Sequence, residues 1–294
     1  MLQKLSEKVS MVFAEEGFTF GHCLLVEDDV RLLIDSGAGK ALQDAHPEHI
    51  DILINSHHHI DHIRGNDQCP NAKVFLHPLE QQCLREPEKL VAVTGWNELM
   101  GEDLATSDNL GITMEQMVKS WQISGDIVDG QIIDCGSTKI EVLHTPGHSS
   151  GHCSFFFPED GLVFLGDICL TKVGPWYGGP EADIDEFIDS INRIIDLKPE
   201  KITTGHMNKV STDYHDLIEY RNRIFKRENK ILETLKQQPK SINELADQHL
   251  IYRLHPSVFV LFWEKYMLKN HLERLIRMNA IEKEEEGRYY TKQT

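Results

Sequence analysis

The segment Ser-His-His-His-Ile-Asp-His, residues 56–62, directly follows a short apolar run that predicts a buried strand. His57 and His59 are two residues apart, a spacing that points both imidazoles to the same side of an extended chain, where they can share one metal ion. Asp61 and His62 come where the chain has to turn, so they can serve a second ion beside the first. Imidazoles packed beside a carboxylate are costly in a protein interior unless a cation organises them. The segment therefore predicts a metal centre; a solvated histidine-rich loop is the weaker alternative.

The composition is that of a folded protein with unevenly distributed charge. The chain has 294 residues, of which 40% are hydrophobic and 26% charged, and its formal net charge is −17. Residues 220–294 contain 15 Lys and Arg against 10 Asp and Glu, a net of +5, so the preceding 219 residues carry −22. Such an acidic body repels nucleic-acid phosphates unless metal ions invert the field locally. Residues 1–17 hold no apolar segment of signal-peptide or membrane-span length, so we expect a cytoplasmic protein without membrane association.

A faint internal repeat relates two parts of the chain. Each part begins with a His-Cys pair, at residues 22–23 and 152–153, and continues through an apolar strand, an acidic turn and a second strand. Two halves with one plan predict two sheets that face each other. The repeat also pairs Asp35 with Asp167, since each stands at the end of the second strand of its half.

Other candidate site residues also follow apolar strands. His148 stands in Thr-Pro-Gly-His-Ser-Ser-Gly-His, and His206 follows a glycine after a short strand. Residues 147–151 also spell Gly-x-Ser-x-Gly, the pattern of serine hydrolases. That pattern requires a helix after the serine, whereas an aromatic strand follows here, so a serine hydrolase is the weaker alternative. We expect a layered α/β protein whose site lies along one sheet edge.

The character of the chain changes near residue 216. A long charged helix to about residue 238 is followed by a short helix that a Ser-x-x-Glu capping box opens at Ser241. A further helix after Pro256 and a terminal hairpin complete the order of a winged helix, which either binds nucleic acid or serves as a packing or dimerisation module. Bulky apolar residues outnumber Lys and Arg on the third helix, which favours packing. We expect two domains, residues 1–215 and 216–294.

The ordered set of these motifs resembles the metallo-β-lactamase superfamily over about residues 10–215. The resemblance implies a four-layer αββα sandwich and two metal ions, with Asp35 as a partner that orients the ligand loop. The ligands that it implies are His57, His59 and His148 for the first ion, Asp61, His62 and His206 for the second, and Asp167 as the bridge between them.

The chemistry follows from this implied ligand set. Nitrogen and oxygen ligands without a thiolate suit zinc first, with iron or manganese as alternatives. Two divalent ions lower the pKa of a bridging water, so a hydroxide exists at neutral pH and can attack a carbonyl or phosphoryl group. Asp61 can take the proton as the intermediate forms. Trp176 and Tyr177, just beyond Asp167, are the candidate substrate wall, and the Tyr177 hydroxyl is the candidate donor to the oxyanion.

The bond that is cleaved is less narrowly defined. Within the superfamily the chain is similar to glyoxalase II-like hydrolases and to a lactamase-like branch with a C-terminal winged helix. The first implies a small-molecule thioester or ester, which the acidic body favours; the second leaves open an endoribonuclease or phosphodiesterase on single-stranded RNA. A regulator in which the winged helix binds nucleic acid, β-lactam hydrolysis and a homodimeric assembly are further hypotheses. The stretch 88–124, rich in Met and Trp, is expected to be a packed surface insertion or a lid.

Overall fold

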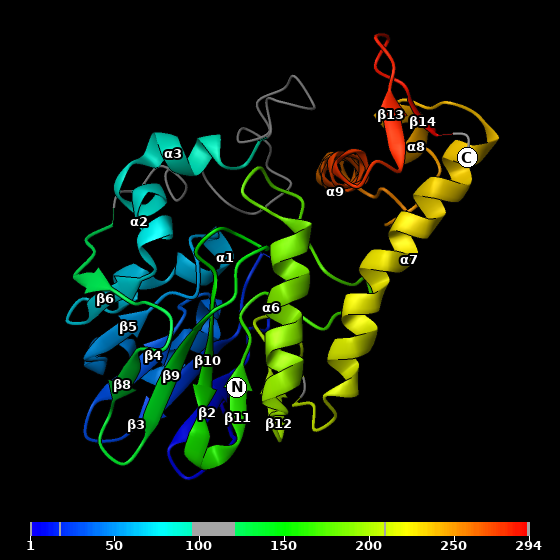
Figure 1. The fold of residues 1–294 in the computed structure, drawn as a ribbon. Coiled ribbons are helices and arrows are strands. Elements are labelled where there is room, and N and C mark those ends of the chain that lie inside the picture. The colour runs from blue at the N-terminus through cyan, green and yellow to red at the C-terminus, as the bar shows by residue number, and fades with distance from the viewer. Residues whose placement is uncertain (1, 18, 96–120, 209, 293–294) are drawn as a thin grey trace.

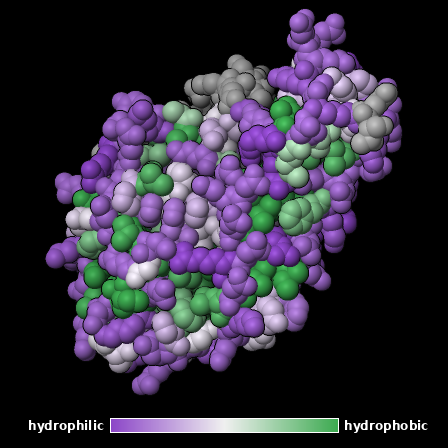
Figure 2. Space-filling model, in the orientation of Figure 1, coloured by the Kyte–Doolittle hydropathy of each residue, from purple (hydrophilic) through white to green (hydrophobic). Residues whose placement is uncertain are grey.

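The computed structural model describes residues 2–17, 19–95, 121–208 and 210–292. Most of the predicted insertion at 88–124 therefore lies outside the described residues. Within these ranges, no helix combines the length and the apolar character that crossing a bilayer requires. Figure 2 shows that hydrophilic side chains cover most of one face of the molecule, with hydrophobic residues in groups between them.

One sheet contains seven strands in chain order, β1 to β7. Neighbouring strands are antiparallel up to β4, and β4 to β7 are parallel. The first two strands were not predicted, because the amino-terminal residues mix polar and single apolar side chains; β2 is nevertheless buried along its length. The strands are Leu2–Lys4, Val9–Val12, Cys23–Glu27, Arg31–Ile34, Ile52–Ile54, Lys73–Leu76 and Gly125–Asp126.

The second sheet contains five strands in the order β12-β11-β10-β9-β8. Its strands β10 and β11 form an antiparallel hairpin, as β3 and β4 do in the first sheet. The predicted repeat therefore corresponds to one hairpin in each sheet. The strands β8 to β12 are Ile132–Asp134, Lys139–His144, Cys153–Phe157, Leu162–Phe164 and Lys201–Thr203.

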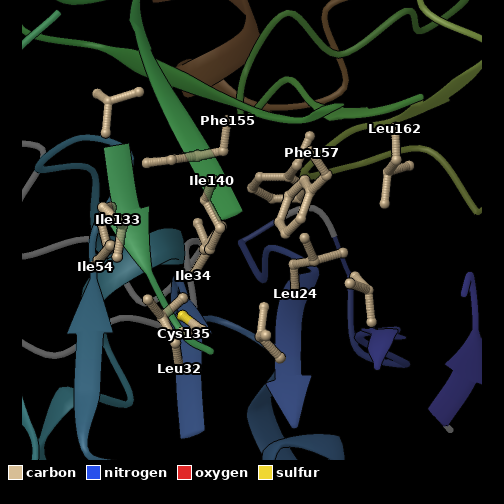
Figure 3. Packing of buried hydrophobic residues seen from close by; sticks show 14 of the residues in the cluster. Leu24, Leu32, Ile34, Ile54, Ile133, Cys135, Ile140, Phe155, Phe157 and Leu162 are labelled. Atoms are coloured by element: carbon tan, nitrogen blue, oxygen red, sulfur yellow. The ribbon is translucent and has the colours of Figure 1, made fainter. Parts of the chain in front are cut away.

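The two sheets face each other across a hydrophobic core (Figure 3). The side chains in this core include Leu24, Ile34 and Ile54 from the first sheet and Ile140, Phe155 and Phe157 from the second. Strands that alternate their side chains between two faces can bury one face here and the other under helices. The prediction of two facing sheets is confirmed.

Helices cover the outer faces. The 3-10 helix η1 (Gly39–Ala45) lies over the first sheet and is followed by the short 3-10 helix η2 (Pro47–His49). Helix α6 (Ile184–Leu197) lies over the second sheet, with its apolar stripe against β11. The resulting αββα order confirms the predicted four-layer fold (Figure 1). The short elements of the connections are α1 (Ile60–Ile63), η3 (Asn66–Gln68), α2 (Pro78–Arg85), α3 (Pro87–Ala92) and η6 (Pro158–Asp160).

The C-terminal part has the predicted order of three helices and a hairpin. They are α7 (His215–Gln237), α8 (Ile242–Ala246), α9 (Val258–Arg277), β13 (Ile281–Lys283) and β14 (Tyr289–Thr291). The capping box at Ser241 is present, with both of its hydrogen bonds. The first half of α7 packs with α6 through Tyr220 and Ile224, and its second half packs with α8 and α9 through Ile231 and Leu235. This helix therefore joins the sandwich to the C-terminal helices (Figure 1). The domain boundary and the winged-helix assignment remain predictions.

Candidate metal centre

The histidine-rich segment leaves the first sheet after β5 and turns at once into the single-turn helix α1. His59 stands at the N-cap of this helix in an extended conformation, and Asp61 and His62 lie within the turn. The change from extended chain to helical turn separates the side chains of the segment into two groups. Both groups could hold a metal ion, and they share the carboxylate of Asp167, which follows β11.

The first group joins three imidazoles to Asp167. The Nε2 atom of His148 lies 3.2 Å from His57 Nε2, 2.9 Å from His59 Nδ1 and 3.3 Å from Asp167 Oδ2. Burial, together with the neighbouring histidines, holds the pKa of His57 and His59 well below the usual range. Neutral imidazoles at these distances point lone pairs at one another, an arrangement that a shared cation relieves.

The second group places two imidazoles between two carboxylates. His206 Nε2 lies 3.2 Å from an oxygen of Asp61 and 3.2 Å from an oxygen of Asp167. His62 Nε2 lies 3.0 Å from Asp167 Oδ1 and 3.8 Å from Asp61 Oδ2. Burial opposes the protonation of His206, but the two carboxylates outweigh burial and raise its pKa to about 10. The position between these groups therefore strongly favours positive charge.

Among the described residues, two buried polar atoms of the second group lack the hydrogen bonds that burial normally requires, and this bears on whether a metal ion fits there. His62 Nε2 and Asp167 Oδ1 have no hydrogen-bond partner in the described part of the chain, although they lie 3.0 Å apart. A buried polar atom without a partner is costly. Both atoms belong to one group of candidate ligands, so a cation at that position would satisfy both of them.

Asp35 lies directly behind the histidine-rich segment and is fully buried. One of its oxygens accepts the backbone N–H of Ser56 at 2.7 Å; the other accepts the Ser56 hydroxyl at 2.8 Å and contacts His62 Nδ1 at 2.8 Å. Ser56 Oγ in turn lies 3.0 Å from His57 Nδ1. With both Nδ1 atoms engaged behind the site, the Nε2 atoms of His57 and His62 are directed toward it.

Glu80 on α2 was missed by the sequence analysis. Its buried carboxylate pairs with His58 Nδ1 and accepts the hydroxyl of Ser149 at 2.7 Å and the N–H of Gly151 at 2.6 Å. Glu80 thereby ties the histidine-rich segment to the loop of His148. Ser149 is the serine of the Gly-x-Ser-x-Gly pattern; its burial and its hydrogen bond to Glu80 agree with a serine hydrolase being the weaker alternative. No local pattern around Glu80 marks this role.

Close backbone packing holds the ligand loops together. His152 Nε2 accepts the backbone N–H of Asp167 at 2.9 Å, so this histidine positions the shared carboxylate. A Cβ atom at Gly37 would lie 1.5 Å from the backbone oxygen of Asp61, and one at Gly205 would lie 2.7 Å from the ring of His62. Only glycine fits at these two positions.

Trp176 and Tyr177 point in different directions. The Trp176 ring lies 5.5 Å from His59 and 5.1 Å from His148 between centroids, and its backbone oxygen lies 3.2 Å from His148 Nδ1. Tyr177 is fully buried; its hydroxyl lies 2.6 Å from His271 Nε2 and accepts a bond from Arg227 at 2.7 Å. This geometry does not support the predicted catalytic and wall roles of Tyr177, because alternation along the chain turns it toward α7 and α9.

The candidate ligands open into a cavity of about 620 Å³. Its lining includes His59, Asp61, His148, Asp167 and His206. The lining also includes aromatic residues from both the sandwich and the C-terminal helices, among them Trp176. Pockets of this size hold small organic ligands.

Comparison with known proteins identifies the family of the chain. Residues 17–206 match the family model of the Metallo-beta-lactamase superfamily. The chain is 24% identical over 265 residues to Beta-lactamase-like protein 2 homolog of Drosophila melanogaster, covering 86% of this chain and 80% of that protein. It is 26% identical over 163 residues to Acyl-coenzyme A thioesterase MBLAC2 of Homo sapiens, covering 53% of this chain and 56% of that protein. It is 30% identical over 177 residues to Hydroxyacylglutathione hydrolase of Maricaulis maris (strain MCS10), covering 56% of this chain and 55% of that protein. The chain thus spans about half the length of the last two relatives.

A solved structure has the same fold over nearly the whole chain. It is the crystal structure of metallo-beta-lactamase family protein TTHA1429 from Thermus thermophilus, with a TM-score of 0.80 and 23% identity, covering 98% of this chain and 100% of that chain. The matched family model covers more than half of the sequence and includes every candidate ligand from His57 to His206. The chain belongs to the metallo-β-lactamase superfamily.

Proposed function

We propose that this chain is a binuclear-metal hydrolase that cleaves a thioester or an ester. The observation that carries the proposal is the convergence of His and Asp side chains in two groups that share Asp167, at a cavity large enough for a small organic substrate. The match to a superfamily of hydrolases supports the same reaction class.

The proposed ligands follow the two groups. They are His57, His59 and His148 for one ion, Asp61, His62 and His206 for the other, and Asp167 for both. Their nitrogen and oxygen atoms suit zinc first, with iron or manganese as alternatives. Two divalent ions, when bound, supply Lewis acidity toward a carbonyl oxygen and a hydroxide at neutral pH. Asp35 keeps the imidazoles of the histidine-rich segment oriented.

Asp61 is the proposed proton acceptor. Burial raises the pKa of Asp61, but His62 and His206 outweigh burial and lower it to about 2, so the carboxylate is ionised at neutral pH. In the reaction, the oxygen of water bonds to the carbonyl carbon, and the bond from that carbon to the sulfur or oxygen of the leaving group breaks. Asp61 accepts one of the two protons of the attacking water and returns it to the leaving group, which departs as a thiol or an alcohol. The other proton stays on the carboxylic acid product, which releases it to solvent at neutral pH.

The charge of the cavity favours a carboxylic ester or thioester over a phosphodiester. In the described ranges no Lys or Arg lines the cavity, whereas Glu15, Glu16 and Asp61 do. Phosphate recognition relies on cationic side chains, above all in nucleic-acid binding. The names of two relatives, an acyl-coenzyme A thioesterase and a hydroxyacylglutathione hydrolase, point to the same bond class.

A substrate panel with metal-quantified protein tests the proposal. The panel contains S-lactoylglutathione, an acyl-coenzyme A, an aryl ester, bis-p-nitrophenyl phosphate and a single-stranded RNA. We expect turnover of a thioester or an ester, its loss after dialysis against a chelator and its return with zinc, iron or manganese. Turnover of RNA without turnover of any ester would overturn the proposed bond class.

Replacement of Arg227 with lysine is expected to weaken metal binding by about tenfold. The guanidinium of Arg227 donates to three oxygens of the loop that carries Trp176, and the backbone oxygen of Trp176 faces His148 Nδ1. Lysine keeps the charge but lacks the planar fork that bonds several oxygens at once. A competition titration with a chromophoric chelator measures the affinity. Arg223→Lys is the control, since Arg223 donates to the exposed start of the same loop. Equal affinities of the two variants would contradict this expectation.

A further inference from the structure

The C-terminal helices contribute side chains to the cavity that contains the candidate ligands. Tyr252, in the segment between α8 and α9, and Phe262 and Trp263, on α9, line the same cavity as His59 and Asp61. From a much earlier part of the sequence, Leu90 on α3 and Val93 just after this helix also line the cavity. Residues that lie far apart in the sequence therefore form one apolar wall beside the metal centre.

The aromatic wall is continuous with the candidate ligands. Trp176 lies edge-on to His59, with ring centroids 5.5 Å apart, and Trp263 lies edge-on to Trp176 at 6.2 Å. Phe259 continues the series behind Trp263, with centroids 6.4 Å apart. The first two pairs are T-shaped, which is a favourable geometry for aromatic rings. The wall thus leads from the first ligand group to α9 through successive contacts between aromatic rings.

Polar side chains of α9 hold the wall in place. Glu264 on α9 is fully buried, and its two oxygens accept the backbone N–H groups of Ile251 at 3.1 Å and Tyr252 at 2.7 Å. The Asn270 side chain donates to the backbone oxygen of Tyr177 at 2.8 Å, which ties α9 to the loop of Trp176. The aromatic side chains are therefore preorganised, which lowers the entropic cost of binding a ligand.

We propose that this wall, formed by Trp176, Tyr252, Phe262 and Trp263, is the acyl subsite of the enzyme and accepts an uncharged, apolar acyl group longer than acetyl. This inference rests on the proposed hydrolase function and adds the substrate class to it. Apolar walls stabilise an acyl chain by removing it from water, while the carboxylates of Glu15 and Glu16 at the same cavity disfavour an anionic one. The scissile carbonyl then lies beside Asp61, and the leaving group lies toward solvent.

S-acyl derivatives of N-acetylcysteamine test the subsite, because their leaving group is small and uncharged. From acetyl through butanoyl to hexanoyl, we expect kcat/KM to rise by about fourfold for each methylene group that the wall buries. Succinyl has the length of butanoyl but carries a carboxylate, and we expect a kcat/KM at least about tenfold lower than for butanoyl. A flat series, or a preference for succinyl, would overturn the inference.

The variant Trp263→Ala tests whether the aromatic wall causes the preference for longer acyl chains. The ratio of kcat/KM for hexanoyl to that for acetyl is expected to fall by about tenfold or more in this variant, because the longer chain loses its aromatic partner. Phe225→Ala is the matched control: Phe225 is an aromatic residue of α7 that is 37% exposed and is not part of the cavity lining. The same ratio in wild type and Trp263→Ala would overturn the assignment of the wall.

A binding measurement separates failure of the subsite from failure of the proposed reaction. Calorimetric titration with octanamide, which has an uncharged apolar chain, is expected to show binding to the wild-type protein that is about tenfold weaker in Trp263→Ala and unchanged in Phe225→Ala. If no thioester is turned over but octanamide binds in this pattern, the proposed reaction fails and the subsite stands. If thioesters are turned over and octanamide does not bind, the subsite fails and the reaction stands.

Discussion

Asp61→Asn is expected to lower kcat/KM for the best thioester or ester substrate by about 10²- to 10⁴-fold. Asparagine has nearly the shape of aspartate but cannot accept the proton of the attacking water. The native carboxylate is free of a proton at neutral pH, because His62 and His206 keep it ionised. Steady-state kinetics of the metal-loaded variant beside the wild type measure the loss.

Metal analysis must accompany these kinetics, because Asp61 also belongs to the second candidate ligand group. A variant that keeps both ions and loses turnover supports the proton-transfer role, whereas parallel loss of one ion and of turnover assigns Asp61 to metal binding. Asp29→Asn, at an exposed acid remote from the cavity, is the control and should leave both quantities unchanged. If the Asp61→Asn protein kept both ions and turned over substrate at the wild-type rate, Asp61 would be required neither for proton transfer nor for metal binding.

Glu80→Gln is expected to reduce the free energy of unfolding by about 3 kcal/mol. The Glu80 carboxylate is fully buried, pairs with His58 and accepts hydrogen bonds from Ser149 and Gly151. Loss of its charge leaves His58 in a buried environment without a counter-charge. The neutral amide of the introduced glutamine can itself be buried there, so the expected loss comes from the missing charge. Urea denaturation of the metal-free proteins measures the change, so that metal affinity does not enter the comparison.

The control for this stability prediction is Glu88→Gln on α3, where the native carboxylate is exposed to solvent. A surface substitution of this kind normally changes the free energy of unfolding by less than about 0.5 kcal/mol. If Glu80→Gln unfolded at the same urea concentration as Glu88→Gln, the His58–Glu80 pair would contribute nothing to the stability of the fold. A large loss would show that the ligand loops are joined by this buried carboxylate before any metal binds.

Much of the fold could be predicted because it depends on local patterns. Apolar strands that end in polar residues, the hairpin repeat and the capping box at Ser241 all express short-range preferences of the chain. The histidine-rich segment could be read in the same way, since the spacing of His57 and His59 and the turn at Asp61 set the directions of the side chains. The amino-terminal strands were missed because the pairing of β1 with β2 and of β2 with β3, rather than their own composition, makes them strands.

The sequence by itself thus determined the two facing sheets, because strand patterns and the internal repeat are local features of the chain. The side chains of the two candidate ligand groups were implied by the resemblance of the ordered motifs to the superfamily. Only the tertiary structure decided how these side chains are supported and what faces them. Glu80 reaches His58 across 22 positions of the chain, and Tyr177 turns away from the cavity to meet Arg227. Trp263 enters the cavity from a helix that begins only at Val258, far along the chain from the candidate ligands. Such contacts depend on how whole elements pack against one another, and no local pattern of residues encodes them.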